Sequence, residues 1–153
     1  TGTNMARTLD AVVAELDGAG TEMEETCKAI SHGSLMGARG NSGVILSQIL
    51  RGFVGNINEA RESKVNASRV AESLKKASAA AYEAVLKPIE GTILTVVRES
   101  ADGAAQAAAD GASLVGVLRA ARAAGTATPF CMEAGEQLEF ATLMERGTRI
   151  SIK

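Results

Sequence analysis

Aromatic residues are scarce in this chain: they make up 3% of its 153 residues, and tryptophan is absent. Hydrophobic residues still make up 46% of the chain, so a core has to be assembled from Ala, Val, Leu, Ile and Met. Small aliphatic side chains pack well between closely spaced helices, which favours a helical bundle over a β-sandwich. The length is within the range of a single domain.

The chain also lacks a surplus of charge, a cysteine motif and a long apolar run. Its net charge of −2 gives no reason to expect nucleic acid or an anionic membrane as a partner. Cys27 and Cys131 lie far apart and outside any CxxC pattern, so we interpret both as thiols of a reducing compartment. No apolar run approaches the roughly 20 residues of a membrane span, and the first residues lack the layout of a signal peptide. We therefore expect a cytoplasmic protein without a membrane span.

Apolar residues three and four positions apart recur from residue 5 to residue 121, a spacing that predicts amphipathic helices. No pair of alternating strands precedes the final "RISIK", so we expect an all-α fold. The helices are expected at 5–16, 21–32, from 42–44 to 52 or 55 (well buried), 67–86, from 92 into the Ala-rich stretch, and from 114 to 125. The polar stretch 56–66 is expected to be a connection, and 125–153 follows no clear pattern.

Three glycines, Gly37, Gly40 and Gly43, fall within "MGARGNSGVILSQIL" at residues 36–50. Glycine in a helix interior costs about 1 kcal/mol relative to alanine, so the cluster needs a reason. One reading is a tight interhelical turn in which Asn41 or Ser42 caps the next helix. The other is an anion site, because exposed N–H groups at a helix start attract phosphate and glycines let its oxygens approach. The spacing alone leaves both readings open.

Two further helix starts have the same character. "TGTNM" at residues 1–5 offers Thr3 or Asn4 as a cap, and "GTIL" at 91–94 follows a proline turn. In an antiparallel bundle, alternate helix starts gather at one end, so three such starts together favour a site more than any one does. Arg39, inside the glycine loop, is either a phosphate contact or a solvated turn residue.

Together, "TGTNM", "SLMGARGNSGVILSQILRGF" and "KPIEGTILTVVRESAD" resemble the DhaL-type nucleotide-binding domain. This domain is shared by dihydroxyacetone kinases and the kinase subunit of bacterial fatty acid kinase. The segment "MGARGNSGVILSQ" at residues 36–48 is more similar to the fatty acid kinase branch. The resemblance covers residues 1–124 and leaves 125–153 as a divergent tail. It implies an antiparallel barrel of amphipathic helices, eight when complete, with ATP or ADP held at one end by interhelical loops.

The resemblance also implies which residues form the site. Residues beside the metal–phosphate centre would be Gly2, Thr3 and Asn4. Phosphates would be held by Gly40, Asn41, Ser42 and Gly43. The nucleotide base would be bordered by Thr92, Ile93 and Leu94.

Two departures from the family pattern bear on activity. The family places an Asp-Gly-Asp element, whose carboxylates bind two magnesium ions, directly before "TGTNM"; here those ligands would lie upstream of Thr1. The family's closing glycine-rich nucleotide contact has no match in "EAGEQLEFATLMERG". We therefore expect a domain incomplete at both ends, with no metal ligand or catalytic residue of its own, that binds ATP weakly and is inactive as written.

The resemblance implies that the intact parent is a magnesium-dependent kinase. It would transfer the γ-phosphoryl group of ATP to a fatty-acyl or small-molecule acceptor held by a partner protein. A dihydroxyacetone kinase-like subunit is the first alternative, and a non-catalytic helical interaction module is the second. A homodimer is compatible with either, and nucleic acid is not expected as a partner.

Overall fold

The computed structural model describes residues 1–59 and 65–127, and these form six α-helices with no strand among them. The helices are α1 (Gly2–Asp17), α2 (Met23–Met36), α3 (Gly40–Glu59), α4 (Ala67–Glu83), α5 (Ile93–Ala109) and α6 (Leu114–Ala127). The predicted all-α class is confirmed. The tail predicted as a separate segment lies outside the described residues from position 128 onward, and so does Cys131.

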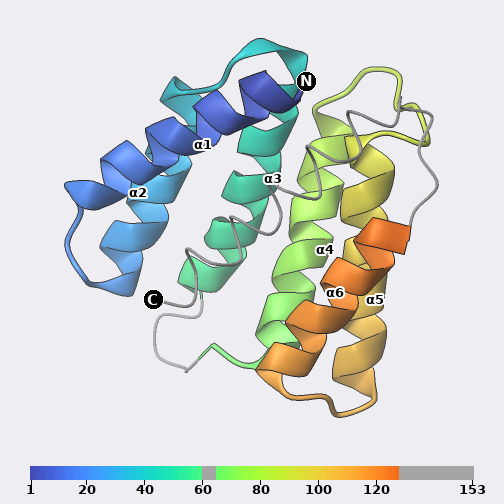
Figure 1. Ribbon diagram of the computed structural model, residues 1–153. Helices are drawn as coiled ribbons and strands as arrows, with labels where there is room; N and C mark the ends of the chain where they lie inside the picture. Colours follow the sequence, from blue (N-terminus) through green and yellow to red (C-terminus); the bar gives the residue numbers. More distant parts are fainter. Residues whose placement is uncertain (60–64, 128–153) are drawn as a thin grey trace.

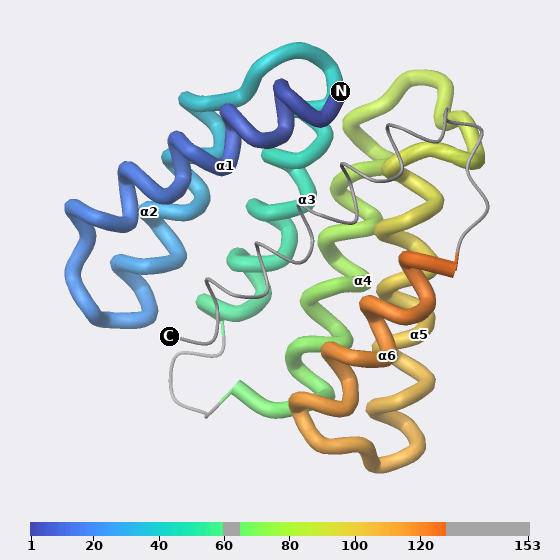
Figure 2. Tube along the Cα trace, viewed as in Figure 1, coloured from blue at the N-terminus to red at the C-terminus, as the bar shows by residue number. Residues whose placement is uncertain are grey.

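Each helix packs against the next in the sequence, and α1 also packs against α3, as α4 does against α6. Successive helices run in opposite directions, so α1, α3 and α5 all begin at one end of the bundle, at the top of the view in Figure 1. Figure 2 traces the chain at this end: the N-terminus lies beside the loop that leads into α3. The three helix starts singled out in the sequence therefore share one end.

The core is aliphatic, as the composition predicts. The larger cluster draws on α2 to α6 and contains Cys27, Val54, Ile57, Val70, Ala71, Ala104, Val117 and Ala121. The smaller cluster contains Ala81, Leu94 and Val97, with Ile45 and Ile49 of α3 packed against it. This second cluster joins the first half of α3 to the end of α4 and the start of α5, so it supports the end at which α3 and α5 begin.

The helix boundaries differ from the prediction at the first two helices. Helix α1 begins at Gly2 with Thr1 as its N-cap, so Thr3 and Asn4 lie in its first turn and cap nothing. Helix α2 begins one residue after Glu22, its N-cap, and extends beyond the predicted end at residue 32 to Met36. Thr21, expected to open this helix, precedes it.

Glycine does not end α3, and the expected connection at 56–66 is wrong for its first four residues. The helix passes through Gly52 and Gly55 and ends at Glu59. Gly52 lies against α4: a Cβ there would meet the Ala77 Cα at 2.9 Å. Asn56, which reads as a loop residue, is 1% exposed and donates a hydrogen bond from Nδ2 to the Ser73 Oγ at 2.9 Å. Glycine here serves close helix packing, so its helix-breaking tendency is overridden.

The face that α3 buries is also smaller and more polar than expected. Val44 is 46% exposed, and Ile45 and Ile49 are half-buried. The buried residues of α3 are Gly43, Ser47, Val54, Asn56 and Ile57. Helices that approach closely leave little room between them, so small side chains occupy the contact.

Two later boundaries also shift. Helix α4 ends at Glu83, three residues before the predicted end. Helix α6 passes through Gly125, the predicted stop, and its described part ends at Ala127. Gly125 is buried against α5, where a Cβ would collide with the Ser100 hydroxyl. As at Gly52, the glycine permits contact with a neighbouring helix.

Candidate functional site

A direct contact joins the starts of α1 and α3. The Ser42 hydroxyl, in the first turn of α3, donates to the carbonyl oxygen of Thr1 at 3.3 Å. The two helix starts, 41 residues apart in the sequence, therefore lie side by side. This brings together the first two residue groups predicted for the site.

A second connection runs through Thr8, which is 0% exposed. Its hydroxyl donates to the Asn4 carbonyl oxygen at 2.8 Å and accepts a hydrogen bond from the Arg39 backbone N–H at 3.3 Å. Arg39 is the residue directly before α3. One buried hydroxyl thus links the first turn of α1 to the loop that enters α3.

The glycine cluster faces α1, which answers why the glycines are there. A Cβ on Gly43 would lie 2.6 Å from the Thr8 Oγ1, and one on Gly40 would collide with the Asn4 side-chain amide. Gly40 also has φ +59°, in the left-handed region that glycine adopts without strain. A Cβ on Gly37 would likewise collide with the Cβ of Ala11, about one helical turn after Thr8 in α1. These glycines therefore allow α1 to pack closely against the loop before α3 and the first turn of α3.

The starts of α1 and α3 also differ from those of α4 and α5. Asn66 and Thr92 each cap their helix by accepting a hydrogen bond from a backbone N–H. Thr1 makes no such bond, and the Ser42 hydroxyl is directed to Thr1. The capping interpretation therefore holds for Thr92 and fails for the residues of α1 and for Ser42.

Six backbone N–H groups consequently point out of these two uncapped first turns. They belong to Gly2, Thr3, Asn4, Gly40, Asn41 and Ser42, and residues 1–59 and 65–127 supply none of them with an acceptor. The first N–H groups of a helix lack intrahelical partners and carry a partial positive charge, which makes such turns anion sites. The Gly43 N–H differs, because it donates to the Arg39 carbonyl at 3.0 Å.

The third predicted group lies at the start of α5. The Thr92 hydroxyl accepts from the Leu94 N–H at 3.3 Å and donates to the Ile89 carbonyl at 2.8 Å. Leu94 is 2% exposed and belongs to the smaller core cluster, against which Ile45 of α3 packs. Thr92 and Ile93 are half-buried. The Leu94 side chain thus anchors the start of α5 in the smaller cluster, against which residues of α3 also pack, while Thr92 and Ile93 keep exposed surface.

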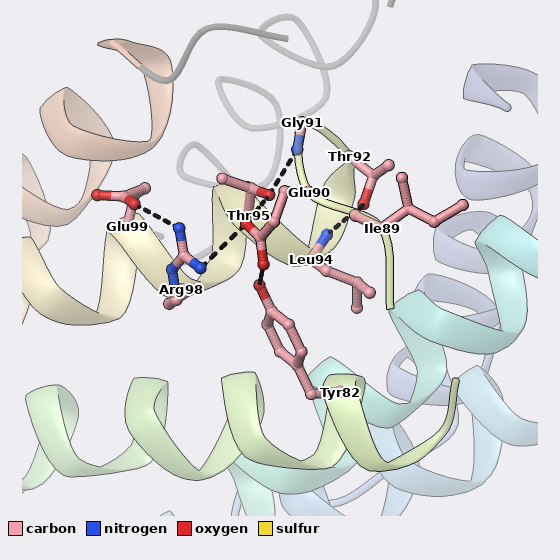
Figure 3. A network of polar contacts seen from close by, with 9 residues as sticks. All are labelled: Tyr82, Ile89, Glu90, Gly91, Thr92, Leu94, Thr95, Arg98 and Glu99. Carbon is pink, nitrogen blue, oxygen red and sulfur yellow. Dashed lines mark hydrogen bonds and ion pairs between the residues drawn. The ribbon is translucent and has the colours of Figure 1, made fainter. Parts of the chain in front are cut away.

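Glu90 organises the loop before α5, as Figure 3 shows. Its carboxylate accepts from the Thr95 hydroxyl at 2.7 Å and the Tyr82 hydroxyl at 3.0 Å, and it pairs with Arg98 Nη1 at 3.0 Å. The Gly91 N–H donates to the Thr95 Oγ1 at 2.8 Å. Hydrogen bonds from Thr95 and then Tyr82 hold the pKa of Glu90 below its ordinary value. The network fixes residues 90 and 91, which lead directly to Thr92.

Four residues of the site region, Thr8, Tyr82, Glu90 and Thr95, were not predicted from the sequence. A usable signal exists for the two threonines: each stands at a helix position that faces the core, among apolar neighbours, where a hydroxyl needs a partner. Tyr82 and Glu90 offer no comparable pattern, because they meet only through the path of the loop between α4 and α5.

Arg39 behaves as a turn residue. Its guanidinium is exposed, and Nη1 donates to the carbonyl oxygens of Met36 at 3.3 Å and Ala38 at 3.0 Å. The side chain thus closes its own loop.

The described residues do not fit a magnesium site. No group of three or more His, Cys, Asp or Glu side chains gathers anywhere in residues 1–59 and 65–127. The side chains at the starts of α1 and α3 are hydroxyls and amides, whereas Mg²⁺ is usually held through carboxylates.

None of the helices in residues 1–59 and 65–127 has the length and apolar character of a membrane-spanning segment.

The chain is similar to known proteins over most of its length. A protein-family model described as the DAK2 domain matches residues 1–133. Uncharacterized proteins of Staphylococcus aureus strains bovine RF122 / ET3-1, USA300 and COL are each 48% identical over 109 residues. The matched segment covers 71% of this chain and 20% of each relative, so the match spans only about a fifth of the length of these proteins. The chain belongs to the DAK2 domain family, the DhaL-type nucleotide-binding domain of the dihydroxyacetone kinases.

Proposed function

We propose that the end of the bundle where α1, α3 and α5 begin binds ATP, with its phosphates against the first turns of α1 and α3. The observation that carries this proposal is the pair of adjacent, uncapped helix starts joined by the Ser42–Thr1 contact. Six N–H groups with no other acceptor in the described chain suit the oxygens of a polyphosphate.

The site residues have different tasks in this proposal. Gly2, Thr3 and Asn4 offer N–H groups from α1, and Gly40, Asn41 and Ser42 offer them from α3. The side chains of Thr3, Asn4, Asn41 and Ser42 add further donors, and the Ser42 hydroxyl would exchange the Thr1 carbonyl for a phosphate oxygen when the nucleotide binds. Gly43 contributes space, because its N–H is already engaged within the helix. Thr92 and Ile93 border the base from the start of α5, and Leu94 supports that border from the core.

For the longer protein in which this domain works, we propose transfer of the ATP γ-phosphoryl group to an acceptor held by a partner protein. The domain's share in such a reaction is to position the nucleotide and stabilise negative charge, which dominate catalysis of phosphoryl transfer. A fatty-acyl carboxylate is the proposed acceptor, because the sequence of residues 36–48 resembles the fatty acid kinase branch. Dihydroxyacetone is the alternative acceptor. We propose Mg²⁺ only for a protein that carries upstream carboxylates, and no step here depends on the metal.

Isothermal titration of ATP into the chain tests the site, with Asn41→Ala/Ser42→Ala as the variant. The substitutions leave the backbone N–H groups in place and remove the side-chain donors of Asn41 and Ser42. Each lost hydrogen bond to a charged phosphate would cost about 1.5–3 kcal/mol, so we expect a clear loss of affinity, with only a small loss of thermal stability from the exposed Ser42–Thr1 contact. Ser68→Ala is the matched control, because Ser68 is exposed in the first turn of α4, at the opposite end of the bundle. Unchanged affinity together with a lower melting temperature would return the loop to a purely structural role.

A further inference from the structure

We infer that Thr8 is a positioning residue: its hydroxyl fixes where the first turn of α3 lies and thereby aims the phosphate-binding N–H groups. The inference rests on the proposed nucleotide site and goes beyond it, because Thr8 itself is 0% exposed and has no access to a ligand. Its influence on binding would pass entirely through Asn4, Arg39 and Gly43.

The hydrogen bonds of Thr8 give the first reason. The hydroxyl hydrogen is directed to the Asn4 carbonyl at 2.8 Å, which leaves the oxygen lone pairs to accept the Arg39 N–H at 3.3 Å. Arg39 directly precedes Gly40, whose φ of +59° sets the direction of the chain into α3. A shift of the Arg39 N–H would therefore move the N–H groups of Gly40 and Asn41 with it.

The space around Gly43 gives the second reason. Its missing Cβ would lie 2.6 Å from the Thr8 Oγ1 and 3.6 Å from the Asn4 carbonyl oxygen. A glycine at this position therefore leaves room for the hydroxyl, and any larger residue would push α3 away from α1. Thr8 and Gly43 act as a matched pair that sets the distance between the two helix starts.

Plain core packing predicts something different. Valine has nearly the shape of threonine, so Thr8→Val would fill the same volume and a packing role would survive. The positioning role would not, because the Arg39 N–H would lose its acceptor. Thr8→Ser, which keeps the oxygen and loses the methyl group, would have the opposite effect.

The first experiment measures amide hydrogen exchange by NMR in the wild-type chain, Thr8→Val and Thr8→Ser. We expect the Arg39 amide to exchange about tenfold faster in Thr8→Val and near the wild-type rate in Thr8→Ser. The amides of Val12 and Val54, within α1 and α3, serve as internal controls and should not change. An unchanged Arg39 rate in Thr8→Val overturns the inference whether or not the chain binds nucleotide.

Titration with ATP on the same variants connects the hydroxyl to binding. We expect affinity to fall about tenfold in Thr8→Val, the factor that corresponds to one hydrogen bond of ordinary strength, and to be retained in Thr8→Ser. Equal affinity in the wild type and Thr8→Val overturns the positioning role and leaves the proposed site intact. Absence of ATP binding to the wild type overturns the proposed function, and Arg39 exchange then decides on Thr8 by itself.

A double substitution separates the effect of Thr8 on stability from its effect on the position of the phosphate-binding N–H groups. Gly43→Ala should lower the melting temperature because of the collision with Thr8, whereas Gly55→Ala, with no atom within 4 Å of the added Cβ, should not. Thr8→Ala/Gly43→Ala should recover stability relative to Gly43→Ala, since the removed hydroxyl makes room for the new Cβ. ATP affinity should stay low in the double variant, because the Arg39 N–H still lacks its acceptor. Additive losses of stability, or recovery of affinity with stability, would each overturn the inference.

Discussion

The Tyr82 hydroxyl donates to the Glu90 Oε1 at 3.0 Å, and this bond joins the end of α4 to the loop that leads into α5. The same carboxylate receives the Thr95 hydroxyl from the first turn of α5. Glu90, two residues before Thr92, is therefore hydrogen-bonded to both α4 and α5 (Figure 3). The proposed border of the nucleotide base begins at Thr92. The ionisation of Glu90 therefore affects how firmly this border is positioned.

The pKa of Glu90 tests this network directly. Thr95 lowers it most and Tyr82 second, so Thr95→Val should raise the pKa of Glu90 more than Tyr82→Phe does. Both substitutions keep the side-chain shape and remove one hydroxyl donor each. Titration of the Glu90 carboxyl carbon by NMR gives the values. A larger rise in Tyr82→Phe than in Thr95→Val would contradict the ranking of the two bonds.

Stability should depend on pH through the same group. The pKa of Glu90 lies below its ordinary value of 4.5 in the folded chain, so the ionised form stabilises the fold. That contribution is present above the ordinary pKa and is lost as the pH falls through the folded-state pKa. Glu90→Gln removes the ionisation, so the melting temperatures of the wild type and this variant should converge in acid. A constant difference down to about pH 3, well below the ordinary carboxyl pKa, would show that Glu90 does not titrate in this way.

Local patterns predicted the helical class and the shared end of three helix starts, because both follow from spacing and alternating direction. They could not predict the role of the glycines. Gly52 and Gly125 were expected to end helices, yet each lies inside one, against a neighbour that only the tertiary fold brings near. Asn56 was misplaced for the same reason, since its partner Ser73 is on another helix.

The candidate site was predictable where residues are adjacent in the sequence. Asn41 and Ser42 were singled out correctly as part of a helix start, but both the capping and the phosphate readings fit their spacing. The distinction depends on where the Ser42 hydroxyl is directed, and its acceptor on Thr1 is 41 residues away. Thr8 was not predicted at all, because its hydroxyl accepts the Arg39 N–H, which is 31 residues away in the sequence.

The contact between α3 and α4 gives a third prediction. In Gly52→Ala, the new Cβ would lie 2.9 Å from both the Ala77 Cα and the Lys76 carbonyl oxygen, which are backbone atoms that cannot rotate away. We expect a loss of about 1–3 kcal/mol in the free energy of unfolding, typical of overpacking. Gly55→Ala, on the same helix with open space around it, should be neutral or gain up to about 1 kcal/mol. Chemical denaturation measures both, and equal effects would rule out close packing as the reason for Gly52.

The last prediction concerns magnesium. The groups proposed to meet the phosphates are backbone N–H groups with the side chains of Thr3, Asn4, Asn41 and Ser42, which are neutral donors. Such groups bind phosphate oxygens directly, whereas Mg²⁺ is usually held through carboxylates. Without neutralisation by a metal, donors of this kind hold a polyphosphate only partially, because several negative charges stay exposed to solvent. We therefore expect this chain to bind ATP weakly, with nearly the same affinity in magnesium and in chelator. Isothermal titration under both conditions measures this, with Asn41→Ala/Ser42→Ala showing that the heat comes from the proposed site. Tight binding that chelator abolishes would mean that carboxylates of this chain hold the metal, and the assignment of the phosphate contacts to neutral donors would be wrong.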